Sequence, residues 1–137
     1  MRRIHKRSDC PVSFSLDILG DKWTMLILRD LALNSKHFYK DFLEAGEGMA
    51  TNVLSDRLKM LESYEIIKSK PYEKRKTMKY YSLTEKGIEL IPVLIELWVW
   101  GAKFDPETTV SKEDLNTRLA SRQEQIDKYV KMAREEV

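Results

Sequence analysis

Short hydrogen-bonding side chains share one face of the segment from about 50 to 63. Leu54, Leu58 and Leu61 recur there at the spacing of an amphipathic helix, which places polar side chains on the opposite face and its flank. Side chains of this kind hydrogen-bond with base edges in the major groove of DNA. The residues that we expect to read bases are Thr51, Asn52, Ser55, Asp56 and Lys59.

A basic segment follows this helix, from about 66 to 83. Its apolar residues have the short, alternating pattern of two strands, and Pro71 disfavours a helix between them. Glu73 is the only acid from Ile66 to Tyr80, and concentrated positive charge pairs with phosphates and releases counterions. Lys74, Arg75 and Lys76 form the expected tip of this wing, on the DNA backbone or in the minor groove. The basic residues of the segment are Lys68, Lys70, Lys74, Arg75, Lys76 and Lys79.

Each of these features alone has an ordinary explanation. A charge run is more often a solvated surface than a binding site, and a Leu stripe with polar residues opposite is typical of any surface helix. The order of the pieces, a polar-faced helix followed directly by a basic hairpin, favours a DNA-binding unit.

Helices before this segment are expected to position it. Asp21 is placed to cap a helix from Lys22 to about Leu33, whose many apolar residues predict burial. Residues 38–44 read as a third helix. Gly46 and Gly48 then supply the turn that joins the two helices of a helix-turn-helix.

The remainder of the chain predicts further helices and a dimer. Thr84 should cap a helix that bends at Pro92, and Ser111 should begin a single amphipathic helix over 112–137, about 39 Å long at about 1.5 Å per residue. We expect a partner subunit to cover this helix; the alternative is that it folds back on its own domain. Two recognition helices about 34 Å apart would then read a pseudo-palindromic operator. The expected interface residues are Leu97, Trp98, Leu115, Leu119, Ile126 and Val130.

Composition limits the other possibilities. The 137 residues, with 42% hydrophobic residues and a net charge of +2, suit one compact domain with an added element. The expected division is a basic N-terminal arm (1–9), a DNA-binding domain (10–104) and a helical dimerisation arm (105–137). With no membrane-length apolar run, the protein should be cytoplasmic, with no membrane partner. One cysteine, two histidines and the lack of a Gly-rich phosphate loop predict no metal, no cofactor and no enzymatic activity.

Several stretches, taken in order from about Cys10 to Trp100, resemble the HxlR-type winged helix-turn-helix transcriptional regulators. They include Cys10-Pro11-Val12, Gly20-Asp21-Lys22-Trp23, the run Gly-Met-Ala-Thr-Asn-Val-Leu at 48–54, and Tyr-Ser-Leu-Thr-Glu-Lys-Gly at 81–87. The resemblance implies a mainly α fold with a small β-hairpin wing (α+β) and dimerisation helices at both ends. It also implies a bacterial or archaeal dimeric transcription factor, which we expect to be a repressor. One departure is Glu65, where the family usually has Gly, a residue suited to a left-handed helix end.

The resemblance also assigns roles. Asn52 is expected to contact adenine in bidentate fashion, and Lys59 a guanine edge or a phosphate. Asp56 either accepts a hydrogen bond from cytosine or stands clear of the phosphates. Arg57, beside the buried stripe, is expected to be mainly structural with an added phosphate contact. Lys36 and Lys40 are further expected phosphate contacts.

Two questions stay open at this stage. The matching cysteine of some relatives senses electrophiles or oxidants, and basic residues near Cys10 favour a reactive thiolate, whereas Asp9 opposes it. The alternative for Cys10 is a small buried hydrophobe. The second question is whether the winged helix instead binds protein without specific DNA binding, through the surface around Trp98 and Trp100.

Overall fold

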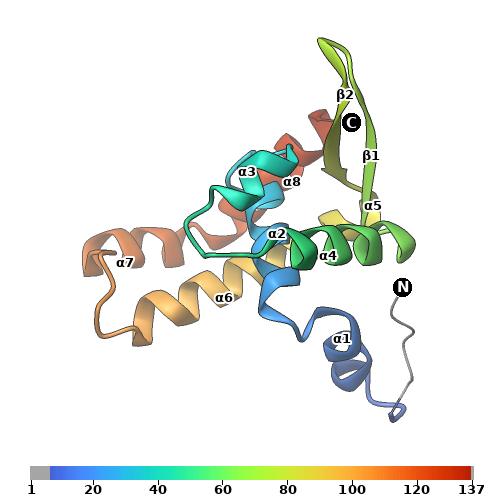
Figure 1. Ribbon diagram of the computed structural model, residues 1–137. Coiled ribbons are helices and arrows are strands. Elements are labelled where there is room, and N and C mark those ends of the chain that lie inside the picture. Colours follow the sequence, from blue (N-terminus) through green and yellow to red (C-terminus); the bar gives the residue numbers. More distant parts are fainter. Residues whose placement is uncertain (1–6, 137) are drawn as a thin grey trace.

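Helices and a single hairpin make up the computed structural model, which describes residues 7–136; the expected basic arm therefore lies mostly outside the described residues. Figure 1 shows the hairpin rising from one end of the helical body, with α4 at its foot and α8 behind it. The elements are α1 (Pro11–Leu19), α2 (Lys22–Leu33), α3 (Tyr39–Leu43), α4 (Thr51–Ser63), β1 (Ile67–Tyr72), β2 (Arg75–Leu83), α5 (Glu85–Ile88), α6 (Ile91–Phe104), α7 (Lys112–Ala120) and α8 (Arg122–Glu135).

The centre of the core is α2, as its apolar sequence predicts. The side chain of Asp21 accepts a hydrogen bond from the backbone N–H of Thr24 at 3.1 Å, which confirms the expected helix cap. Ile27 and Leu28 are fully buried. The Leu stripe of α4 is buried as well, so the amphipathic pattern identified the correct inner face.

The turn between α3 and α4 depends on glycine. Gly46 and Gly48 have φ angles of +83° and +74°, which lie in the left-handed region that other residues avoid. The predicted helix-turn-helix connection is therefore confirmed.

The wing is an antiparallel hairpin whose strands pair from Ile67 with Leu83 to Tyr72 with Arg75. Its base is closed by a tight approach: a Cβ on Gly87 would overlap the carbonyl oxygen of Ile66. Thr84 caps α5 by accepting a hydrogen bond from the N–H of Gly87 at 3.1 Å, as predicted. The position of α5 fixes the angle at which the wing leaves the body.

The helix expected to bend at Pro92 is instead two separate helices. α5 ends at Ile88 and α6 begins at Ile91, with Pro92 in its first turn. Proline is well tolerated there, because the first-turn N–H groups lack intrahelical partners in any case. The proline thus starts a helix rather than bending one.

The prediction of one long C-terminal helix is wrong. The segment forms α7 and α8, which meet at Ser121, and α8 folds back against α2, α5 and α6. Ala133 is buried in the core, and Ile126 and Val130 pack against it. The apolar stripe of α8 thus packs against its own chain, where Ile126 and Val130 are half-buried, and residues 105–137 are not an extended arm. No helix within residues 7–136 has the length and apolar character needed to cross a bilayer.

Candidate nucleic-acid interface

The predicted base-reading face of α4 lies on the surface. Thr51, Asn52, Asp56 and Lys59 are exposed, and Ser55 is half-buried. Leu54 and Leu58, on the other side of α4, are buried. The helix therefore presents short polar side chains outward from a rigid backbone that the core holds in place.

Tyr39 of α3 fixes the start of α4. Its hydroxyl group donates to the carbonyl oxygen of Thr51 at 3.1 Å and lies 3.0 Å from Oγ of Ser55. Ala50, the residue before α4, gives no side-chain cap. The first N–H groups of α4 therefore have no capping side chain and can donate to an anion such as a DNA phosphate. The sequence analysis missed Tyr39, because nothing in the spacing of α3 relates it to α4.

Arg57 is occupied by carboxylates. Its Nε donates to Oδ2 of Asp21 at 2.7 Å and its Nη2 to Oδ1 at 3.3 Å, while Nη1 is bonded to Asp56. The hydrogen bond from Arg57 lowers the pKa of Asp21, and the same bond raises the pKa of Arg57. The expected structural role of Arg57 is therefore the one that the geometry supports, and we no longer count it as a phosphate contact.

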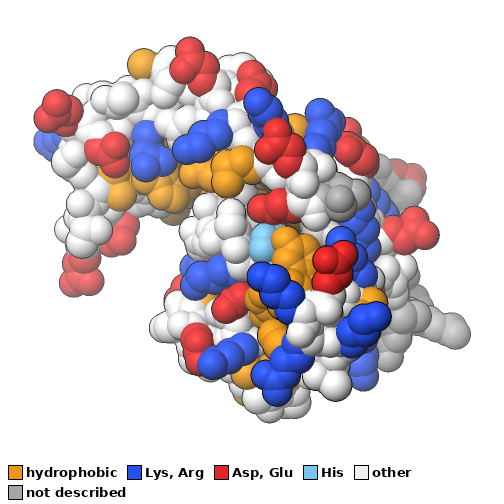
Figure 2. All heavy atoms as spheres, turned by 90° about the horizontal axis from the view of Figure 1, so that it is seen from above, with side chains coloured by type: hydrophobic (Ala, Val, Ile, Leu, Met, Phe, Trp, Pro, Cys, Tyr) orange, Lys and Arg blue, Asp and Glu red, His pale blue; other side chains and the backbone are white. Residues whose placement is uncertain are grey.

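Every basic residue of the wing is exposed, and Nζ of Lys70 lies 5.7 Å from the ring centroid of Tyr80. Glu73 and Lys74 form the turn, and Arg75 and Lys76 begin β2 beside it. The exposed cations therefore line both strands and the tip. Figure 2 looks down on this side of the molecule and shows Lys and Arg side chains around a strip of hydrophobic side chains beside the histidine.

An aromatic cluster ties the wing to the rest of the chain. The N–H of Tyr81 donates to the carbonyl oxygen of His37, and Nδ1 of His37 lies 2.8 Å from the carbonyl oxygen of Tyr81. Tyr80 stacks on the His37 ring, with 4.5 Å between ring centroids, and burial raises the pKa of Tyr80. Nε2 of His37 lies 3.2 Å from a carboxylate oxygen of Glu136. The wing, the loop before α3 and the end of α8 thus meet at His37.

The two additional lysines fall in different places. Lys40 is exposed on α3, 3.8 Å from Glu44 across one helical turn, and remains a candidate phosphate contact. Lys36 is half-buried and lines a cavity behind α2. We therefore remove Lys36 from the set of expected phosphate contacts.

Exposed apolar side chains lie on α1 and on α6, two helices in the lower part of the molecule in Figure 1. Leu97, an expected interface residue, is 53% exposed and Trp100 is 66% exposed. Trp98 is half-buried, with the guanidinium group of Arg118 lying 4.7 Å from its ring centroid, so it belongs to the interior side of α6. Leu115 and Leu119 are half-buried on α7. The exposed apolar residues of this surface are Val12, Phe14, Leu16, Val93, Leu97, Trp100 and Phe104.

A family model described as HxlR-like helix-turn-helix matches residues 18–109. The chain belongs to this family. The match confirms the resemblance seen in the sequence, and it covers the helix-turn-helix, the wing and all of α6.

Relatives of this HxlR-like protein are named as regulators. An HTH-type transcriptional regulator of Halalkalibacterium halodurans is 33% identical over 101 residues, which cover 74% of this chain and 89% of the relative. The HTH-type transcriptional regulator YodB of Bacillus subtilis is 33% identical over 107 residues, covering 77% and 95% of the two chains. The protein is therefore a DNA-binding transcriptional regulator and not an enzyme.

Solved structures confirm the winged-helix fold. PA1607, a protein described as a transcription factor, matches with a TM-score of 0.69 and 34% identity over 78% of this chain and 75% of that chain. The reduced form of YodB from B. subtilis matches with a TM-score of 0.56 and 30% identity over 74% and 99%.

Proposed function

We propose that this HxlR-like regulator binds a pseudo-palindromic operator as a homodimer. In this proposal each α4 lies in a major groove and each wing holds the adjacent backbone or minor groove. The observation that carries the proposal is the pairing of an exposed polar face on α4 with a wing whose cations are all exposed. Asn52, Lys59 and the tip residues Lys74, Arg75 and Lys76 are exposed, so their side chains are accessible to a ligand.

Base reading is assigned to the exposed residues of α4. Thr51 and Asn52 stand in its first turn, next to N–H groups that lack a capping side chain, and a phosphate bound there would orient Asn52 toward base edges. Asp56 and Lys59 lie about one and about two turns further along the helix on the same side. Ser55 already contacts Tyr39, so its hydroxyl group can share that bond with a base or a water molecule.

The test of base reading uses an operator selected from a random duplex pool. Asn52→Ala should lose about 1–3 kcal/mol on that operator and much less on random duplex. Ser63→Ala, at the far end of the same helix, is the control and should leave both affinities unchanged. Equal losses on operator and random DNA for Asn52→Ala would remove the base-reading role.

The dimer is assigned to the apolar surface of α1 and α6. Exposed patches of this kind on a soluble domain mark interaction sites, and a twofold axis at this surface would place two copies of α4 in one particle. Leu97 is common to the sequence prediction and to the exposed surface, while Trp100 and Phe104, with rings 5.3 Å apart, extend it.

Leu97→Asp should therefore yield a monomer by light scattering and lower operator affinity far more than affinity for random DNA. Lys131→Asp puts the same charge on the exposed side of α8 and should leave a dimer. If the wild-type protein is monomeric at micromolar concentration, the dimer is refuted. Affinity for random duplex that does not depend on salt would instead favour a module that binds protein.

We also propose control through the thiol of Cys10. The thiol is exposed at the start of α1, so Cys10 is not a buried hydrophobe, and an adduct there would sit beside the apolar surface assigned to the dimer. The proposed signals are small electrophiles or oxidants. Diamide or a quinone should change operator affinity of the wild type but not of Cys10→Ser; indifference of both proteins would leave Cys10 without a sensing role.

The proposed direction of regulation rests on where the operator lies. A dimer on an operator that overlaps a promoter blocks polymerase, so we propose repression, in the cytoplasm where the chromosome of a bacterium or archaeon lies. A reporter gene under the selected operator should be expressed more strongly when the protein is removed. Lower expression would show activation instead.

A further inference from the structure

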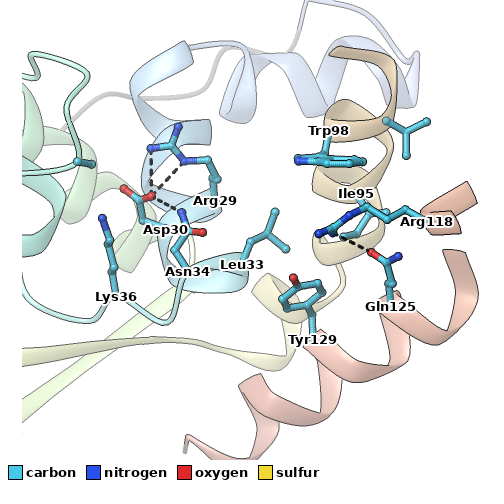
Figure 3. Close-up of a pocket in the computed structure, with 12 residues that line it drawn as sticks. Arg29, Asp30, Leu33, Asn34, Lys36, Ile95, Trp98, Arg118, Gln125 and Tyr129 are labelled. Atoms are coloured by element: carbon cyan, nitrogen blue, oxygen red, sulfur yellow. Dashed lines mark hydrogen bonds and ion pairs between the residues drawn. The ribbon is translucent and has the colours of Figure 1, made fainter. Parts of the chain in front are cut away.

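A cavity of about 440 Å³ lies between α2, the α3–α4 turn and the C-terminal helices. This volume is typical of sites that bind small molecules. Figure 3 shows that polar groups gather at its two ends, around Asp30 and around Arg118, with apolar and aromatic side chains between them. The apolar and aromatic walls are Leu33, Ala45, Ile95, Trp98, Val99 and Tyr129.

One end of the cavity lacks a hydrogen-bond donor. Asp30 is 1% exposed, and its Oδ1 accepts hydrogen bonds from Arg29 at 3.0 Å and Asn34 at 2.9 Å. Its Oδ2 is buried with no hydrogen-bond partner in the described part of the chain. A buried carboxylate oxygen left in this way costs free energy until a donor reaches it.

The opposite end lacks an acceptor. Nε of Arg118 is buried and has no hydrogen-bond partner among residues 7–136, although Asp114 lies 3.5 Å from it. The guanidinium group stacks on Trp98 and is fixed by Gln125, which accepts from Nη1 at 3.4 Å. A planar guanidinium held in this way is suited to a carboxylate.

The charge of the lining agrees with an anionic ligand. Its cations are Arg29, Lys36 and Arg118, against Asp30 alone. Arg29 is neutralised by Asp30 and Glu47, whereas Lys36 forms no ion pair within the described residues. Arg118 is paired with Asp114 at 3.5 Å, so Lys36 is the lining cation whose charge a bound anion would neutralise.

We propose that this cavity binds an aromatic carboxylate that also carries a hydroxyl group. The hydroxyl group donates to Oδ2 of Asp30, the carboxylate accepts from Arg118, and the ring lies against Trp98 and Tyr129. Such a ligand carries one polar group for each end of the cavity, which neither a plain aromatic acid nor a phenol does.

The site is connected to the DNA-reading elements. Arg29, which holds Asp30, also donates to Glu47 in the turn before α4 at 2.9 Å. A ligand on Asp30 is thus two side chains away from the start of the recognition helix. Binding itself is independent of the proposed function, whereas its effect on operator affinity rests on it.

Titration calorimetry without DNA tests the site with three matched probes: 6-hydroxy-2-naphthoate, 2-naphthoate and 2-naphthol. The hydroxynaphthoate should bind about tenfold or more tightly than either probe that lacks one group. Asp30→Asn should abolish the advantage of the hydroxyl group, and Arg118→Gln the advantage of the carboxylate. Lys131→Ala, on the outer side of α8, is the control and should change nothing.

Several results would overturn the site: equal affinities for the three probes, no saturable binding at millimolar concentration, or an unchanged hydroxyl advantage in Asp30→Asn. Circular dichroism checks that each variant folds; if Asp30→Asn does not, Arg118→Gln decides alone, because part of its side chain is exposed. Operator binding in the absence of the probes tests the proposed function separately. A protein that binds operator and no probe therefore refutes only the ligand site.

Discussion

Removing one cation from the wing should weaken the salt dependence of DNA binding by an amount that can be calculated. Arg75 is exposed at the start of β2, next to the turn, and its guanidinium group forms no ion pair within residues 7–136. Each phosphate contact adds about 0.9 to the slope of log K against log salt. In a dimer Arg75→Ala removes two contacts, so the slope should fall by about 1.8.

That difference gives a measurable ratio of affinities. Raising salt from about 50 to about 200 mM changes log salt by about 0.6, so the wild type should lose about 12-fold more affinity than Arg75→Ala over this range. Fluorescence anisotropy with the selected operator and with random duplex measures both slopes. The loss should be the same on the two DNAs, because phosphates carry no sequence.

Two controls separate this effect from others. Lys131→Ala removes a cation from α8 and should leave the salt slope unchanged. Asn52→Ala should lower the affinity for the operator and also leave the salt slope unchanged. If Arg75→Ala has the wild-type slope, or if it weakens binding to the operator alone, then the wing does not hold phosphates.

The remaining predictions concern stability. The pKa of Asp21 is lowered by its hydrogen bond from Arg57, so the stabilisation it provides is complete above the ordinary carboxyl pKa and is lost as pH falls through the lowered one. Asp21→Asn should therefore cost about 1 kcal/mol near neutral pH and almost nothing once the pH is below the lowered pKa, measured by urea unfolding. A cost that persists in acid would contradict the ion pair. Gly87→Ala should destabilise the protein by about 1–3 kcal/mol in the same assay, because its Cβ must displace the Ile66 carbonyl group; a neutral effect would mean that the wing base is free to move. Glu65 has a φ of +59°, so Glu65→Gly should raise the unfolding free energy by about 0.5–1 kcal/mol, and a decrease would assign the Glu65 side chain a role of its own.

Glu65 also shows how a local departure from the expected sequence is tolerated. The N–H of Ile66 donates to the carbonyl oxygen of Leu61 and that of Glu65 to Glu62, both at 3.0 Å. These are the two hydrogen bonds of a Schellman motif, the helix ending that glycine favours. The turn that a Gly would make is therefore present with a Glu, and the strain is borne by one residue.

The sequence predicted the elements whose signals are local. The Leu stripe defined the inner face of α4, and the capping residues Asp21 and Thr84 marked the starts of α2 and α5. Gly46 and Gly48 marked the turn between α3 and α4. Each signal depends on neighbours within a few positions, so it could be recognised without knowledge of the remaining chain.

The predictions that failed were those that depend on contacts between residues far apart in the sequence. An amphipathic stripe shows that a face is buried but not which chain buries it, so α8 was assigned to a partner although Ala133 lies in its own core. The break at Ser121 carries neither Pro nor Gly. Asp30 did leave a signal, since a carboxylate three residues after Ile27 falls on the buried side of α2, and a charge there needs a partner or a function.

Two ion pairs, one at each end of α2, connect this helix to the recognition helix and to the turn before it. Asp21, at its start, holds Arg57 in the middle of α4, and Arg29, near its end, holds Glu47 in the turn before α4. With both ends fixed, α4 follows α2 as one body rather than tilting within its own domain. In the proposed dimer, a signal would therefore act by moving whole reading units relative to each other. The proposed cavity lies between α2 and α6, and α6 carries the proposed dimer surface, so a ligand there is placed to change the spacing of two recognition helices that DNA requires to be about 34 Å apart.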